Sequence, residues 1–117
     1  MKWRKTPEPL IAFLADAMRG LDCQMKKMFG YPAYFINGNM FIATFQENIV
    51  VRLPQKDRDK LMMQNDEVVP FEPMPGRVMK EYVVLPESLY QDKVNFSQII
   101  DMSVAYVSSL PVKKKKA

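Results

Sequence analysis

The chain has 117 residues, of which 48% are hydrophobic and 26% are charged, a composition typical of one globular domain. It contains no histidine and a single cysteine, Cys23. This excludes a Ser-His-Asp triad, a Cys-His dyad, an intrachain disulfide and a CxxC metal or redox pair. We therefore expect a non-enzymatic domain with no metal and no cofactor.

The net charge of +4 is concentrated at the ends of the chain, since Lys113 to Lys116 alone carry +4. Domains that bind nucleic acid through their folded surface usually carry a basic face instead. We interpret residues 1–112 as a single domain and residues 113–117 as a disordered basic tail. Weak, non-specific binding of nucleic acid, or of an anionic membrane surface, through these lysines is the alternative.

The sequence shows no export signal, because Asp16 and Arg19 interrupt the first apolar stretch. The longest uncharged run, residues 28–46, contains Pro32 and the turn residues 37–39, which do not suit a membrane-spanning helix. We expect a cytoplasmic protein that does not enter a membrane, in which Cys23 is reduced.

The first predicted element is a helix. Thr6 followed by Pro7 predicts its start, with the Thr6 hydroxyl as N-cap. Apolar residues recur at helical spacing over residues 10–21, and Gly20 is the expected stop.

After this helix the apolar period changes to two, which is typical of β-strands. Strands are predicted over residues 24–29, 33–36, 40–45 and 49–53. Asn37-Gly38 is the strongest hairpin signal, because a type I′ turn needs positive φ at both central residues. Glu47-Asn48 is expected to close a second hairpin.

The remaining chain alternates between helix and strand. Residues 54–64 predict a short, exposed helix, and residues 65–76, with three prolines, are expected to form a loop anchored by Phe71. Residues 78–85 predict another strand, followed by a single turn at Leu89 and Tyr90. A last helix is expected to start at Asn95, with Gln98 completing a capping box, and to end at Pro111.

This order predicts an α+β fold: a two-layer sandwich of an antiparallel sheet of four to five strands, with helices at both ends and one between strands. The strands over residues 40–45 and 49–53 carry apolar side chains on both faces, so the face opposite the helices also needs a cover. A second copy of the chain, forming a homodimer, is one candidate cover. The other is that the two terminal helices divide between the faces.

Four blocks of the sequence occur in a recognisable order: Lys26-Lys27-Met28-Phe29-Gly30, the run from Tyr34 to Phe41, Val51-Arg52-Leu53, and Phe71 to Arg77 with Met79 and Tyr82. Together they resemble the N-terminal domain of the TfoX/Sxy family, over about residues 10–110. The resemblance implies a secretion-chaperone-like fold and kinship with regulators of bacterial natural competence, but no reaction. It implies a stand-alone regulatory or protein-interaction domain whose protein partner is unknown.

Five residues are candidate contacts to a ligand or partner: Lys27, Arg52, Arg77, Lys80 and Tyr82. Of these, Arg52, Arg77 and Lys80 are cations on or beside the later predicted strands, where a charge needs either solvent or a partner. Glu81 and Asp57 are the available partners. If these cations are instead free, the alternative function is a small anion- or nucleic-acid-associated accessory protein that uses Arg52, Arg77, Lys80 or the basic ends.

Overall fold

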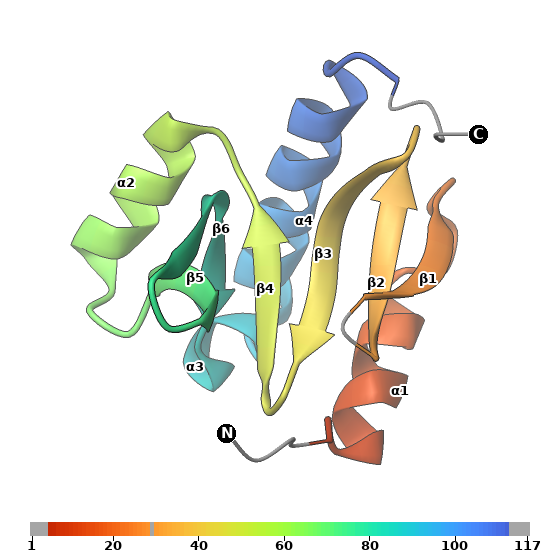
Figure 1. Ribbon diagram of the computed structural model, residues 1–117, viewed down its shortest axis with the longest axis horizontal. Coiled ribbons are helices and arrows are strands. Elements are labelled where there is room, and N and C mark those ends of the chain that lie inside the picture. The colour runs from red at the N-terminus through yellow and green to blue at the C-terminus, as the bar shows by residue number, and fades with distance from the viewer. Residues whose placement is uncertain (1–4, 29, 113–117) are drawn as a thin grey trace.

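The structure, a computed structural model, describes residues 5–28 and 30–112. Within these residues the chain has an α+β fold of one six-stranded antiparallel sheet and four helices (Figure 1). The strands are β1 Gln24–Met28, β2 Tyr31–Ile36, β3 Asn39–Phe45, β4 Asn48–Arg52, β5 Val69–Met74 and β6 Arg77–Leu85. The helices are α1 Glu8–Ala17, α2 Gln55–Gln64, α3 Glu87–Tyr90 and α4 Lys93–Ser108. The predicted tail, residues 113–117, and Phe29 at the predicted end of the first strand lie outside the described residues.

Strands β1 to β4 form a meander in which each strand pairs with the next. Asn37 and Gly38 have φ values of 53° and 80°, as the predicted type I′ turn requires. The second hairpin turns one residue earlier than predicted, at Gln46 and Glu47, and Gln46 also has positive φ. The sheet order is β1-β2-β3-β4-β6-β5, so β1 and β5 are its two edges.

The prediction of a loop over residues 65–76 is wrong for its second half, which forms β5. This adds a sixth strand to the four or five expected. Proline lacks the N–H that a central strand needs, but an edge strand tolerates it, and β5 is an edge strand with two register shifts against β6. Phe71 is 2% exposed, so its predicted role as an anchor in the core is confirmed.

Two predicted helix caps are also wrong. Pro7 occupies the N-cap of α1, and the Thr6 hydroxyl instead donates to the Thr44 hydroxyl oxygen at 3.3 Å. Helix α4 begins two residues before Asn95, because the Asp92 carboxylate accepts hydrogen bonds from the backbone N–H groups of Val94 and Asn95. In both cases the N-cap position is taken by another residue nearby in the sequence, Pro7 for α1 and Asp92 for α4.

All four helices pack on one face of the sheet. The larger apolar core contains side chains of α1, α3 and α4 together with strand residues, and Leu61 and Met62 of α2 pack against it. In Figure 1 helix α4 crosses behind the sheet. Phe41 is an extra residue in the pairing of β3 with β2, and this shift lets both Phe41 and Ile42 join the helix-side core. No helix in the described part of the chain is long and apolar enough to cross a membrane.

The opposite face of the sheet has a separate apolar cluster to which only strands contribute. Its buried members are Ala33, Met40, Ala43, Val50, Phe71 and Tyr82, and its half-buried members are Met28, Phe35, Phe45, Met79 and Val84. The expectation that the two terminal helices could divide between the faces is therefore wrong. We call this second face the open face.

Candidate functional site

Two of the five predicted contact residues, Arg52 and Tyr82, lie together at the end of β4. The Arg52 guanidinium donates to Glu81 Oε1 from Nε at 2.6 Å, and its Nη2 lies 2.6 Å from the same oxygen. Its carbon Cζ is 5.6 Å from the centre of the Tyr82 ring and 5.9 Å from that of Tyr106, so both rings offer cation–π contacts. The Tyr106 hydroxyl donates to Glu81 Oε2 at 2.8 Å. Both carboxylate oxygens of Glu81 are therefore engaged.

This arrangement fixes the protonation of the cluster. Burial alone would raise the pKa of Glu81, but hydrogen bonds from Tyr106 and Arg52, with the charges of Arg52 and Arg58, hold that pKa below its ordinary value. Burial raises the pKa of Tyr82 and of Tyr106, and the bond to Glu81 raises the latter further. At neutral pH Glu81 is therefore ionised and both phenols are protonated, and the Glu81 carboxylate offsets the charge of the Arg52 guanidinium.

Buried hydroxyl groups join the same region to the sheet backbone. Tyr82 Oη donates to the Met40 carbonyl at 2.9 Å, and Ser103 Oγ of α4 lies 2.6 Å from the Arg52 carbonyl oxygen. The Arg58 side chain of α2 donates to the Leu53 carbonyl. These contacts tie α2, α4, β3, β4 and β6 together, which is a structural role for Arg52 and Tyr82.

The other three candidate residues are not assembled with this cluster. Lys27 is exposed on the edge strand β1, whereas Arg77 and Lys80 are exposed on β6. Four strand spacings of about 4.8 Å, or about 19 Å, separate β1 from β6. Of the two expected partners, Glu81 pairs with Arg52, while Asp57 lines a groove described below. Lys27 is therefore far from the other candidates, and Arg52 is paired with Glu81, while Arg77 and Lys80 stay exposed on the neighbouring strand β6.

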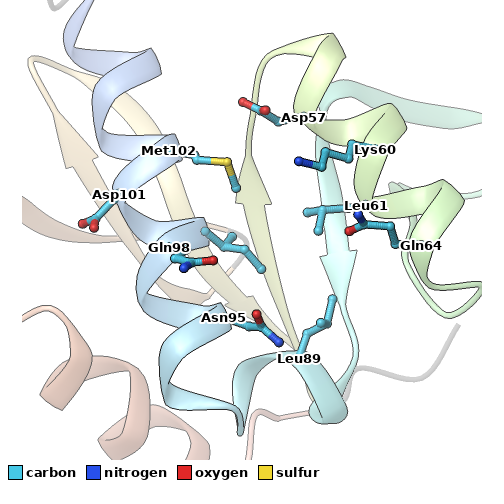
Figure 2. A pocket seen from close by; sticks show the side chains of 10 residues that line it. Asp57, Lys60, Leu61, Gln64, Leu89, Asn95, Gln98, Asp101 and Met102 are labelled. Atoms are coloured by element: carbon cyan, nitrogen blue, oxygen red, sulfur yellow. The ribbon is translucent and has the colours of Figure 1, made fainter.

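A groove of about 420 Å³ lies between α2 and α4 on the helix side (Figure 2). Its apolar lining consists of Leu61, Leu89, Ile99 and Met102, and its polar rim consists of Asp57, Lys60, Gln64, Asn95, Gln98 and Asp101. Lys60 points toward the groove and Asp101 away from it in Figure 2. The rim thus mixes both charges with neutral amides, so it favours no anionic ligand. None of the residues of α2 is buried, so this helix is held only by half-buried contacts.

Within the open face, the larger side chains shield the smaller ones from solvent. Tyr31 and Phe45 have ring centres 5.0 Å apart, as do Phe45 and Phe71. These rings and Tyr82 flank the small residues Ala33, Ala43 and Val50, which are 0%, 1% and 1% exposed.

At the β5–β6 end of the open face lies a pocket of about 480 Å³. Its apolar lining includes Phe45, Val50, Val69, Phe71, Val78 and Val84. Val69 and Val78 are 45% and 50% exposed. Within residues 5–28 and 30–112, the open face is therefore an apolar surface on which no helix packs.

Metal-ligating groups and the thiol of Cys23 are the remaining chemical groups of interest in the described residues. No group of three carboxylate or cysteine side chains among them could hold a metal ion. Burial, and then the charge of Asp22, raise the pKa of the half-buried Cys23 thiol, so it is protonated at neutral pH and a poor nucleophile.

Sequence reasoning missed two features of these surfaces. Tyr106 lies within the predicted last helix, and nothing in its local pattern indicates that it reaches Glu81. The groove between α2 and α4 combines residues about 40 positions apart, so only the tertiary structure reveals it. The apolar character of the open face, in contrast, was visible in the strand pattern.

Comparison with protein families is consistent with this fold. The family model of the TfoX N-terminal domain matches residues 17–106, which include the whole sheet, α2, α3 and most of α4. A search of curated proteins finds no significant match to the chain.

Proposed function

The chain belongs to the TfoX N-terminal domain family, and we propose that it is a non-enzymatic protein-interaction domain that self-associates as a homodimer through the open face of its sheet. One observation carries this proposal: the four helices of the described residues pack on the other face, while the open face displays half-buried and exposed apolar side chains. Contiguous apolar surface of this kind is typical of interaction sites.

The composition of the open face favours a second copy of the chain as its cover. The members of its apolar cluster are uncharged, and the charged side chains of the same face, Lys26 and Glu72, lie on the edge strands β1 and β5, where a dimer can leave them at the rim. Twofold symmetry places the same patch on both subunits, and an apolar patch is complementary to itself. The dimer then excludes water from Phe45, Val69 and Val78, which are half-buried or exposed in one copy.

A regulatory role is the biological setting that we propose for this interaction, in line with the resemblance to competence regulators. We also propose a cytoplasmic location, because the single Cys23 needs no oxidising compartment. The ion pair between Arg52 and Glu81 occupies the guanidinium, and this argues against an anion site on the folded surface as the main function.

Light scattering coupled to size exclusion tests the homodimer. We expect about 27 kDa at micromolar concentration, twice the chain mass of 13.6 kDa. Val78→Glu should shift the mass to that of a monomer, because it places a charge in the patch. Val94→Glu is the matched control, since Val94 is 66% exposed on α4, away from the open face, and this variant should stay dimeric. A monomeric wild-type protein at high micromolar concentration refutes the proposal.

A further inference from the structure

The two edges of the sheet differ in how they receive another strand. Edge strand β5 contains Pro70 and Pro73 and two register shifts, which block regular pairing on its outer side. Edge strand β1 contains no proline and pairs with β2 without interruption, from Gln24 opposite Phe35 to Met28 opposite Tyr31. In the described part of the chain, β2 is the only strand bonded to β1. The outer backbone groups of β1 are therefore regular and have no strand partner among the described residues.

The side chains of β1 give this edge a positive charge on both faces. Successive side chains of a strand alternate between its two faces. Lys26 and Met28 lie on the open face, where Lys26 Nζ is 5.8 Å from the centre of the Phe35 ring and Met28 packs against the open-face cluster. Met25 and Lys27 consequently lie on the other face, and Met25 is 54% exposed. No salt bridge within the described residues involves either lysine.

This charge disfavours a second copy of β1 as the added strand. In antiparallel self-pairing with full overlap, Lys26 lies opposite Lys26 of the other copy. A shift by one residue in one direction places Lys26 opposite Lys27 at two positions, so two of the three registers with the greatest overlap bring lysines face to face. Like charges directly opposite each other destabilise a strand pair, whereas opposite charges stabilise it. A strand with an acidic residue on each face satisfies both lysines, and its apolar residues meet Met25 and Met28.

We propose that the β1 edge binds an extended acidic segment of a partner protein, which adds to the sheet as a seventh strand. Backbone hydrogen bonds to β1 supply affinity that does not depend on sequence, and Lys26 and Lys27 select acidic residues on the two faces of the added strand. The outer backbone groups of β1 point along the plane of the sheet and not out of its open face, so strand addition does not depend on self-association.

Fluorescence anisotropy with a labelled seven-residue peptide tests the charge requirement. The probe carries two adjacent glutamates flanked by valine and threonine, and the control peptide has lysines in place of the glutamates. We expect the acidic probe to bind the full chain, and to bind at least tenfold more weakly at 500 mM than at 50 mM salt. The lysine peptide should not bind. Equal binding of both peptides, or no binding of the acidic one, overturns the proposal.

Paired charge reversals locate the binding surface. The double variant Lys26→Glu and Lys27→Glu should lower affinity for the acidic probe at least tenfold. The double variant Lys56→Glu and Lys60→Glu, which replaces two exposed lysines of α2 far from β1, makes the same change in net charge and should stay within twofold of wild type. Equal losses in both double variants show that only net charge attracts the probe, which overturns the assignment to β1.

A backbone test on the unmodified protein separates strand addition from electrostatic attraction, and it holds even where a β1 variant fails to fold. Alternate N–H groups of an added strand point toward β1, and the others point to solvent. Two probes are N-methylated, one at odd positions and one at even positions. Only one of the two methylation patterns should abolish binding. Equal binding of the two methylated probes overturns the proposal.

Discussion

Replacing Glu81 by glutamine removes the charge at the centre of the cluster that joins β4, β6 and α4. Glutamine keeps the shape of the side chain, but it loses the carboxylate that accepts from Arg52 and from Tyr106. Hydrogen bonds to charged groups contribute about 1.5 to 3 kcal/mol where solvent is excluded. The Glu81 side chain is 36% exposed, so water weakens both contacts. We expect Glu81→Gln to lower the free energy of unfolding by about 1 to 2 kcal/mol at pH 7.

The effect should depend on pH in a defined direction. The pKa of Glu81 in the folded protein lies below its ordinary value of 4.5. The native state therefore binds fewer protons than the unfolded state in this range, and the stabilisation by the carboxylate is complete above about pH 4.5. It is lost as the pH falls below 4.5 and through the lowered pKa of the folded state. The difference between wild type and Glu81→Gln should therefore be full at pH 7 and should shrink below pH 4.5.

Thermal unfolding followed by circular dichroism measures this difference. A loss of 1 kcal/mol lowers Tm by about 4 °C in a chain of this size, so we expect a decrease of about 4 to 8 °C at pH 7. Glu67→Gln is the control, since Glu67 is exposed in the loop before β5, and its Tm should change little at either pH. A Glu81→Gln deficit of the same size at pH 3 and pH 7 would refute the electrostatic reasoning and indicate a loss of packing.

Two further predictions concern a turn and the tail. Gly38→Val should destabilise the fold by more than about 1 kcal/mol, because Gly38 has φ of 80° and a branched side chain is strained there; an unchanged urea midpoint would contradict this. If Lys113 to Lys116 bind DNA, the logarithm of affinity should fall against the logarithm of salt concentration with a slope of about −3 to −4 on duplex, and removal of residues 113–117 should abolish most binding without changing Tm. A truncated chain that keeps its affinity would point instead to Arg77 and Lys80.

The elements that sequence reasoning predicted correctly depend on local chemistry. The turn at Asn37 and Gly38 needs positive φ values that these two residues adopt readily, so the β2–β3 hairpin is determined within a few residues. Helix α2 begins after Pro54, as its fixed φ favours. The prediction that helices pack mainly on one face is also confirmed, since it follows from the layer rules for an antiparallel sheet.

The elements that sequence reasoning missed depend on their position in the tertiary structure. The prolines of β5 argue against a central strand, and only the sheet order shows that this strand lies at an edge. Asp92 and Asn95 are both good N-cap residues, and local sequence does not decide between them. At the cluster of Arg52, Glu81 was among the expected partners, but the contribution of Tyr106 depends on how α4 crosses the sheet.

The packing of every helix on one face has a consequence for how the two proposed interactions combine. Stacking of a second copy on the open face adds a layer about 10 Å away, perpendicular to the sheet. Addition of a strand at β1 extends the sheet by about 4.8 Å in its own plane, along the direction of the backbone hydrogen bonds. The two directions are at right angles, so a dimer built on the open face leaves the backbone edge of β1 accessible in each subunit. Such a dimer presents two cationic β1 edges. A partner with two acidic segments can bind both edges at once if the linker between the segments spans the distance between the edges. Binding of the first segment then raises the effective concentration of the second, so the overall affinity increases without any new kind of contact.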